Sequence, residues 1–149
     1  MAVRMELSRI LIRELADYQI IELREVAPGG AGDGESGGQI EGGRAFPIVI
    51  GRPEAQAIER RLKGVQIKRP QTHDLLASVI TTLGGKRESI TINDLAEQTF
   101  FASLDVRTGE GQVVRVDCRP SDAIALGIAG GVPIFVAEHV LEAATRDEP

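Results

Sequence analysis

The sequence predicts a single α+β domain with a mostly antiparallel or mixed sheet and about four helices packed on it. Three observations lead to this class. Apolar residues alternate with polar ones, at the period of a strand, near the N-terminus and again over residues 88–117. The strand candidates of this second region follow one another through short links, which indicates an antiparallel meander. Helical spacing of apolar residues begins after each of three Arg-Pro pairs.

The composition is that of a globular chain. Its 149 residues are 42% hydrophobic and 26% charged, which is enough apolar material for a core without disulfides. The formal net charge of −5 gives no overall positive field that would attract a polyanion. The sequence has no Trp and few other aromatic residues, so it offers little for stacking on bases. A phosphate-binding role must therefore depend on a local group of arginines.

We expect the protein to be cytoplasmic, without membrane contact. The N-terminal segment carries Arg4, Glu6 and Arg9 within its apolar pattern, which is typical of neither a signal peptide nor a membrane span. One cysteine, Cys118, excludes an internal disulfide and fits a reducing compartment. We interpret Cys118 as a small buried apolar residue rather than a nucleophile.

Two strands are expected first, over residues 3–15 and 18–26. The alternation in the first slips by one position near Ser8 and Arg9, which predicts a bulge or a break between two short strands. A third short strand covers residues 45–50, where Pro47 favours an edge position.

Residues 27–43 predict a flexible loop, because eight of these seventeen residues are glycine. The loop contains a formal G-x-G-x-x-G match at Gly32, Gly34 and Gly37. A dinucleotide site needs a helix to open at that point, and the glycines that follow cannot supply one. We therefore reject the match.

The first two helices each follow an Arg-Pro junction. One begins at Arg52-Pro53-Glu54 and ends at Gly64. In the other, Thr72 is the expected N-cap, so that His73 and Asp74 fall in the first turn. Its apolar residues make it the cleanest amphipathic helix of the chain: Leu75, Leu76, Val79, Ile80 and Leu83.

The remaining segments complete the domain, which we place at residues 1–144. Strands are expected over residues 88–95, 99–107 and 112–117, with turns at Asn93-Asp94, Glu97-Gln98 and 108–111. A third helix follows Arg119-Pro120, where Ser121 and Asp122 can bond its first amides. A strand over 132–136, a helix over 137–144 and a frayed tail over 145–149 end the chain.

The three Arg-Pro junctions carry the candidate site residues. Each helix start offers free N–H groups, and each arginine adds a bidentate donor for phosphate or carboxylate. Carboxylates and a histidine in one cleft could hold Mg²⁺ or Mn²⁺, which would polarise a phosphodiester and activate water. Acidic residues and Ser or Thr in a first helical turn are, however, more often caps than site residues. His73 is the exception, because a protonated ring opposes the helix dipole there.

Several blocks of the sequence together resemble the bifunctional nuclease domain family. The blocks are residues 46–51 with Glu54, then 69–75, 99–102, 117–126 and 133–136, of which Arg-Pro-Gln-Thr-His-Asp and Asp-Cys-Arg-Pro-Ser-Asp-Ala-Ile-Ala are the most specific. The resemblance implies an α+β domain that self-associates, and a nuclease activity on DNA and RNA. It carries over to eight residues: Glu54, Arg69, His73, Asp74, Asp117, Arg119, Ser121 and Asp122.

The leading hypothesis is a nuclease of low sequence specificity, assisted by a metal ion. Asp117 and Asp122, with Glu54 or Asp74, would hold a divalent cation, Mg²⁺ or Mn²⁺. His73 would act as general base or orient the water, as part of a catalytic set of His73, Asp74, Asp117 and Asp122. The substrate-binding set would be Arg52, Arg69, Arg119 and Ser121.

Two alternatives remain open. The chain could be a non-catalytic regulatory or interaction module that binds a small anion or a partner protein, which its negative charge and scarce aromatics favour. Alternatively, the three junctions could be structural, with an oligomer face as the working surface. The distances among the side chains of His73, Asp117, Arg119 and Asp122 decide between these interpretations. Side chains that meet in one exposed cleft indicate a functional site, and side chains that lie apart indicate separate helix caps.

Overall fold

The computed structural model describes residues 2–13, 15–27 and 43–146. Over these ranges the chain forms a seven-stranded mixed sheet with four α-helices, as the sequence predicts for an α+β domain. Residues 28–42 of the predicted glycine-rich loop, with the rejected G-x-G-x-x-G match, lie outside the described residues. Residues 147–149 of the predicted tail lie outside them as well.

The sheet consists of two antiparallel meanders joined by a short central strand. Its strands are β1 (Ala2–Leu11), β2 (Tyr18–Glu25), β3 (Ala45–Gly51), β4 (Lys86–Ala96), β5 (Thr99–Arg107), β6 (Val113–Cys118) and β7 (Ile134–Ala137). Their order is β3-β2-β1-β7-β4-β5-β6. Strand β7 pairs antiparallel with β1 and parallel with β4, which makes the sheet mixed.

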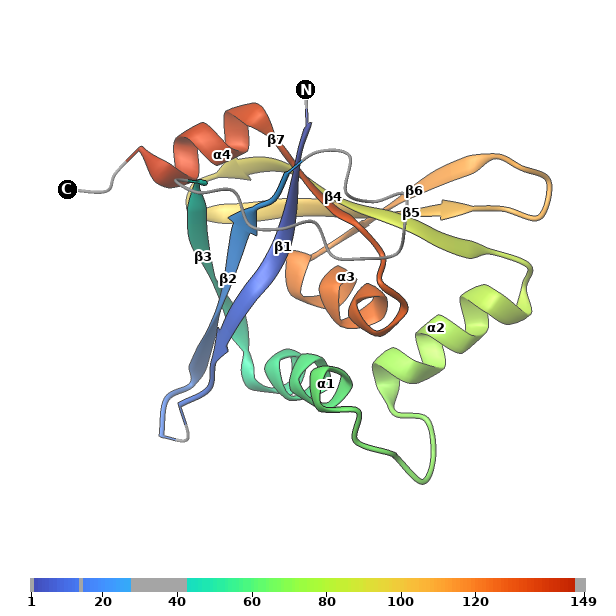
Figure 1. Cartoon of the computed structure of the whole chain (residues 1–149). Helices are drawn as coiled ribbons and strands as arrows, with labels where there is room; N and C mark the ends of the chain where they lie inside the picture. The colour runs from blue at the N-terminus through green and yellow to red at the C-terminus, as the bar shows by residue number, and fades with distance from the viewer. Residues whose placement is uncertain (1, 14, 28–42, 147–149) are drawn as a thin grey trace.

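The helices gather at two ends of the sheet (Figure 1). They are α1 (Arg52–Lys63), α2 (Thr72–Thr82), α3 (Pro120–Gly127) and α4 (Glu138–Thr145), with a 3-10 turn over Ile128–Gly130 after α3. Helices α1, α2 and α3 lie together on one side, and α4 lies at the opposite end of the molecule (Figure 1). Helix α3 packs against both α1 and α2, and therefore brings the three helix starts close to one another.

The core lies between the two meanders and is closed by α1, α3 and α4. Phe46 of β3 and Phe100 of β5 stack with ring centroids 5.5 Å apart, although their strands are not neighbours in the sheet. The strong twist of the sheet thus lets its two halves face each other. Ile58, Ile124 and Leu141 are fully buried in the core and anchor one helix each.

Several sequence predictions are confirmed. The register of β1 against β2 shifts between Leu7 and Arg9, where the slip in alternation predicts a bulge. Strand β3, with Pro47, is an edge strand of the sheet. Strands β4, β5 and β6 form the expected antiparallel meander.

Strand β1 is shorter than predicted and ends at Leu11 rather than Leu15. The reason is the buried side chain of Gln19, which binds the connection that follows. Its Oε1 accepts a hydrogen bond from the Arg13 N–H, and its Nε2 donates to Arg13 O at 3.0 Å and Ala16 O at 3.2 Å. These backbone groups pair with a side chain instead of with a neighbouring strand.

Two local predictions about turns and caps are wrong. The N-cap of α2 is Gln71 and not Thr72, since the Asp74 carboxylate accepts the Gln71 N–H at 3.0 Å and fixes the helix start one residue earlier. Asn93 and Asp94 lie inside β4, where the register shifts between Ile92 and Asp94, and do not form a turn.

Helix α2 differs from its prediction in a more consequential way. The spacing of its apolar residues predicts a face packed on the core, but none of its residues is buried. Leu75, Val79 and Leu83 are 57%, 42% and 81% exposed. The apolar side chains of α2 therefore border an open surface.

Candidate functional site

A groove opens between α1, α2 and the strands β5 and β6, with a volume of about 1370 Å³. One end of it is polar, lined by Glu54, His73, Arg119 and Asp122. The rest is lined mainly by apolar side chains: Leu76, Ile80, Leu104, Val106, Val114 and Val116. The groove therefore combines a charged end with an apolar channel.

The polar end forms because three helices start near it. Pro53 and Pro120 lie in the first turns of α1 and α3, where the missing N–H of proline costs no helical hydrogen bond. Glu54 and Asp122 follow in the same turns, and His73 lies in the first turn of α2. The repeated Arg-Pro-x-acid pattern thus sets the local geometry, and the packing of α3 on α1 and α2 joins the three ends.

His73 and Asp122 are the central pair of the site. His73 Nε2 lies 2.9 Å from Asp122 Oδ1, and the two side chains are 15% and 28% exposed. Burial raises the pKa of the Asp122 carboxyl, but the hydrogen bonds from Arg119 and His73 outweigh it and hold that pKa below its usual value. Asp122 is therefore ionised at neutral pH.

Arg119 links this pair to a second carboxylate. Its Nε donates to Asp122 Oδ2 at 2.9 Å, and its Nη2 donates to Glu54 Oε1 at 2.5 Å. Glu54 is only 7% exposed, and its Oε2 is buried without a hydrogen-bond partner. The guanidinium, whose side chain is 64% exposed, holds both carboxylates while it faces solvent.

Side-chain capping does not explain the α3 start, contrary to the sequence prediction. The N-cap residue is Arg119, which makes no side-chain cap bond. Both oxygens of Asp122 bind Arg119 and His73 instead of helix amides, and Ser121 is buried in the helix.

Asp74 belongs to the structural frame of α2 and not to the groove lining. Its Oδ1 accepts a hydrogen bond from Arg61 Nη2, and its Oδ2 lies 3.9 Å from Arg60 Nη2. With the Gln71 N–H also bound, the carboxylate anchors the start of α2 to the last turn of α1. This supports the interpretation of Asp74 as a cap.

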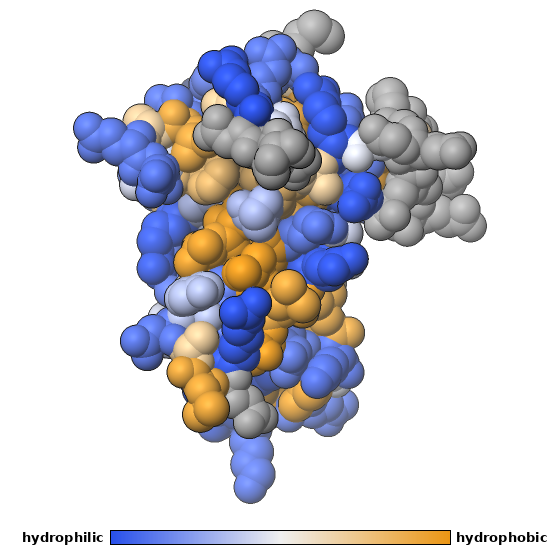
Figure 2. Space-filling model, turned by 90° about the vertical axis from the view of Figure 1, so that its left-hand side faces the viewer, coloured by the Kyte–Doolittle hydropathy of each residue, from blue (hydrophilic) through white to orange (hydrophobic). Residues whose placement is uncertain are grey.

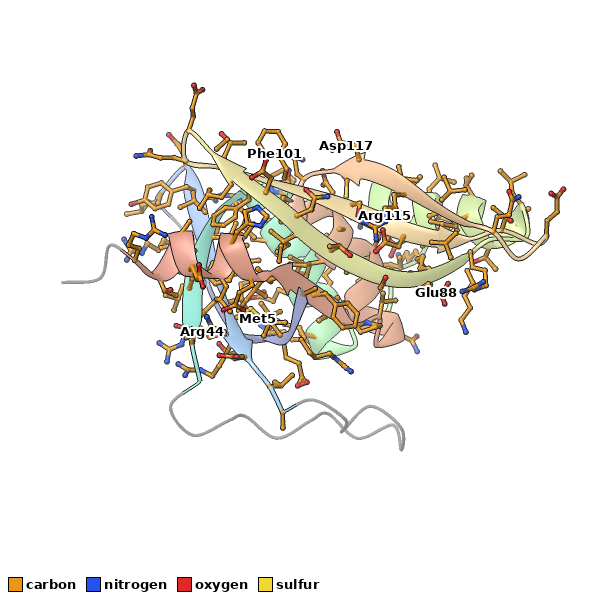
Figure 3. All side chains as sticks on the ribbon, turned by 90° about the horizontal axis from the view of Figure 1, so that it is seen from above. Met5, Arg44, Glu88, Phe101, Arg115 and Asp117 are labelled. Carbon is orange, nitrogen blue, oxygen red and sulfur yellow. The ribbon has the colours of Figure 1, made fainter. Side chains whose placement is uncertain are left out.

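Asp117 borders the groove, but strand alternation directs its side chain to the opposite face of the sheet from His73. Directly paired residues of antiparallel strands share a face, and Asp117 pairs with Ser103 while Val116 pairs with Leu104 of the core. Figure 3 looks onto this outer face, where Asp117 and Arg115 project away from α2 and α3. The predicted cation set of Asp117, Asp122 and Glu54 therefore does not converge.

Two predicted phosphate ligands lie outside the polar end. Arg52 donates from Nη2 to Ala16 O at 2.9 Å and fastens α1 to the β1–β2 connection. Arg69 is exposed on the α1–α2 connection, away from the groove lining. Of the three arginines and one serine predicted to bind substrate, Arg119 is the one that lines the groove.

Comparison with known proteins identifies the family. The model of the bifunctional nuclease domain matches residues 38–149, which is well over half of the chain. The chain belongs to the bifunctional nuclease domain family.

Its relatives include two named plant proteins. Bifunctional nuclease 2 and bifunctional nuclease 1 of Arabidopsis thaliana are 25% and 24% identical over 100 residues, which cover 66% of this chain and 30% and 31% of theirs. An uncharacterised protein of Mycobacterium tuberculosis is 42% identical over 106 residues, or 71% of this chain. The chain spans 62% of the length of that mycobacterial relative.

The residues of this bifunctional nuclease domain do not form a ready cation site. Among the described residues, no three His, Cys, Asp or Glu side chains converge as metal ligands. Arg119 lies between Glu54 and Asp122 and donates a hydrogen bond to each carboxylate. The buried Glu54 Oε2, which has no hydrogen-bond partner among the described residues, favours an additional positive ligand.

Sequence reasoning missed a buried carboxylate on the outer face of the sheet. Asp105 is 4% exposed and accepts hydrogen bonds from Ser89, Thr91 and Ser103, each at 2.8 Å. The alternation of these polar residues along β4 and β5 is that of a solvent-facing side, so no sequence signal marked them as buried. Cys118, which was predicted to be buried, is half-buried, and burial together with Asp117 raises its pKa to about 11.

Proposed function

We propose that this domain is a nuclease of low sequence specificity that hydrolyses phosphodiester bonds at the polar end of the groove. The observation that carries the proposal is the chain of contacts His73–Asp122–Arg119–Glu54. It places a histidine, an orienting carboxylate and an arginine in one open groove. Membership of the bifunctional nuclease domain family, with two Arabidopsis thaliana relatives named nucleases, supports this class.

In this proposal His73 is the general base. An ionised Asp122 can only accept hydrogen bonds, so His73 Nε2 must carry a proton. The neutral ring then has its lone pair on Nδ1, which takes a proton from the attacking water. Water oxygen bonds to phosphorus as the bond to one ester oxygen breaks. The leaving oxygen takes a proton from solvent water, and the protonated His73 then returns its extra proton to solvent.

Arg119 would bind the phosphate. Its guanidinium is exposed enough to reach a ligand, and a phosphate would replace Glu54 or Asp122 as its bidentate partner. The remaining groove offers apolar contact rather than hydrogen-bonding groups arranged for base edges. Recognition through phosphate and apolar contact gives low sequence specificity.

Divalent cation assistance, by Mg²⁺ or Mn²⁺, is a separate part of the proposal. If a cation binds, Glu54 Oε2 and Asp122 are the oxygens to hold it, once Arg119 has moved to the substrate phosphate. A bound cation would supply charge neutralisation at the phosphate.

The proposal also covers location and assembly. The lone, half-buried Cys118 supports a reducing compartment such as the cytoplasm. Among the described residues, no helix has the length and apolar character to cross a membrane. Self-association, which the family resemblance implies, is supported by the exposed apolar residues of α2.

A matched pair of histidine variants tests the activity. His73→Asn should lower cleavage of single- and double-stranded DNA and RNA by about a hundredfold or more, the usual contribution of a general base. His139→Asn is the control, because His139 is 65% exposed and pairs with Asp94 at 3.4 Å, outside the groove. Parallel assays with Mg²⁺, Mn²⁺ and EDTA decide the cation requirement. Equal cleavage by wild type, His73→Asn and Asp122→Asn would point to a contaminating nuclease and reject the proposal.

The second candidate is a non-catalytic module that binds a small anion or a partner protein. The apolar groove and a helix α2 without buried residues favour it. It predicts that a phosphorylated or carboxylated ligand raises the melting temperature without turnover, and that Arg119→Ala removes this effect.

A further inference from the structure

We propose that the groove binds an amphiphilic cation, a small ligand with a protonated amine at one end and an aliphatic body at the other. The ammonium group would pair with Glu54 at the polar end, and the body would lie in the apolar channel between α2 and β6. Such binding is independent of the proposed nuclease activity. Because both use the same groove, a bound ligand would compete with a phosphodiester.

The charges along the groove favour a cationic head group over an anionic one. Asp117 borders the groove, but its side chain points to the other face of the sheet. The remaining charged residues of the lining are three carboxylates and two guanidiniums: Glu54, Glu59 and Asp122, with Arg60 and Arg119. With His73 uncharged, this excess of carboxylate attracts a positive ligand and repels a negative one.

Both guanidiniums of the lining already have partners. Arg119 donates hydrogen bonds to two carboxylates. Arg60 donates from Nη1 to Gln71 Oε1 at 2.7 Å, and its Nη2 lies 3.9 Å from Asp74 Oδ2. An anionic head group would have to displace one of these partners, and it would also add a negative charge to a lining that already has an excess.

Glu54 is an acceptor with capacity left. It lines the polar end and is 7% exposed. Its Oε1 accepts from Arg119, and its buried Oε2 has no hydrogen-bond partner among the described residues. An ammonium group carries three donors and can bond both oxygens of a carboxylate, whereas Arg119 Nη2 bonds one. The head group would take the place of Arg119 on Glu54, and Arg119 would keep its hydrogen bond to Asp122.

The channel beside the polar end fits an aliphatic body. Leu76, Val114 and Val116 line it and are 45%, 46% and 47% exposed, so a ligand can cover apolar surface that water contacts. A volume of about 1370 Å³ is ample for a small molecule. The described lining contains no aromatic ring, so a flexible chain suits it better than a flat ligand that binds by stacking.

Another apolar area, on the side of β2 and β3 (Figure 2), differs in its charges. Val49 of β3 is 64% exposed. Glu22 of β2 shares its face, because Glu22 pairs with Pro47, two residues from Val49. The Glu22 carboxylate accepts a hydrogen bond from Ser8 at 2.7 Å and lies 3.5 Å from Arg24 Nη2. Its charge is matched, so this area serves as a control surface.

Ligands of one chain length test the head group. Octylammonium, octanoate and 1-octanol are titrated into the wild-type protein at pH 8, below micelle-forming concentrations, and methyl NMR shifts of Leu, Val and Ile report binding. Octylammonium should bind about tenfold or more tightly than octanoate. Its dissociation constant should fall about two- to fourfold for each methylene added from butylammonium to octylammonium. Lack of octylammonium binding, or an affinity independent of chain length, would overturn the proposal. Octanoate binding as tightly as octylammonium would overturn it in favour of the anion-binding alternative.

Two pairs of variants locate the site. Glu54→Gln should weaken octylammonium binding by about tenfold and leave 1-octanol binding unchanged, because it removes the charge and keeps the channel. Glu142→Gln, at an exposed position of α4, is its control. Leu76→Ser should weaken octylammonium and 1-octanol alike by about threefold or more, and Val49→Ser, outside the groove, should weaken neither.

Circular dichroism melting confirms that each variant is folded, and the wild-type titrations decide the proposal even if Glu54→Gln does not fold. Equal losses in a variant and its control, in either pair, would overturn the assignment to the groove. Because no nucleic acid is present in these titrations, their outcome is separate from that of the cleavage assays.

Discussion

His73 and Asp122 are 49 residues apart in the sequence, yet His73 Nε2 lies 2.9 Å from Asp122 Oδ1. The contact joins the first turn of α2 to the first turn of α3. Each residue lies in a first helical turn, and together they form a hydrogen-bonded acid–base pair. Asp122 also binds Arg119, so the pair is part of a longer charged chain that ends at the buried Glu54.

Arg119 should matter for stability as well as for substrate. Arg119→Ala leaves the carboxylate of Glu54 buried without its cation, and should lower the free energy of unfolding by about 1–2 kcal/mol. The expected loss is below that of a fully buried pair because Arg119 is largely exposed. Urea denaturation at neutral pH measures it. In Arg119→Ala/Glu54→Gln most of the loss should disappear, and Arg69→Ala, an exposed arginine on a connection, should change stability by less than about 0.5 kcal/mol. A loss in Arg69→Ala equal to that in Arg119→Ala would contradict this account.

The lowered pKa of Asp122 predicts a pH-dependent contribution to stability. Because the folded pKa lies below the usual value for an aspartate, the ionised carboxylate stabilises the fold fully above about pH 5, and this contribution is lost as the pH falls through the folded pKa. The difference in unfolding free energy between wild type and Asp122→Asn should therefore be constant above about pH 5 and shrink progressively as the pH falls below that. Asp94→Asn, at a carboxylate that is 58% exposed, is the control. A difference that stays constant into strong acid would disprove the stated role of Asp122.

The buried Asp105 should be a major determinant of stability. Asp105→Ala removes the common acceptor of three hydroxyl groups and should cost about 3 kcal/mol or more of unfolding free energy. Ser89→Ala removes one of the three donors and should cost about 1 kcal/mol. Thermal and urea unfolding measure both losses. Equal effects for Asp105→Ala and the exposed control Asp94→Ala would show that the cluster does not stabilise the fold.

Much of the fold could be predicted because the local pattern and the packing agree. The slip in β1, the edge position of β3 and the antiparallel β4–β6 meander all follow from rules that involve a few neighbouring residues. The end of β1 could not be predicted, because it depends on a side chain of the next strand. Gln19 of β2 binds the backbone of Arg13 and Ala16, which follow β1. The apolar face of α2 was recognised correctly, but its periodicity does not say what covers it.

The candidate site was predicted only in part for the same reason. Glu54, His73, Arg119 and Asp122 meet in the groove. Asp117 belongs to the same sequence block as Asp122, but strand alternation directs its side chain to the face of the sheet opposite His73. Asp74 binds Arg61 of α1, and Arg52 binds the β1–β2 connection at Ala16 O. No rule of sequence spacing identifies these partners.

The sequence by itself determined the α+β class, the three Arg-Pro-x-acid helix starts and the family, because these depend on local backbone preferences and contiguous motifs. Only the tertiary structure decided which charged residues are partners. Helix α3 packs on α1 and α2, and that packing brings His73 to Asp122 and Arg119 to Glu54. Contacts between residues distant in the chain depend on how whole elements pack, and a hydrogen bond forms only where that packing brings two groups within about 3 Å.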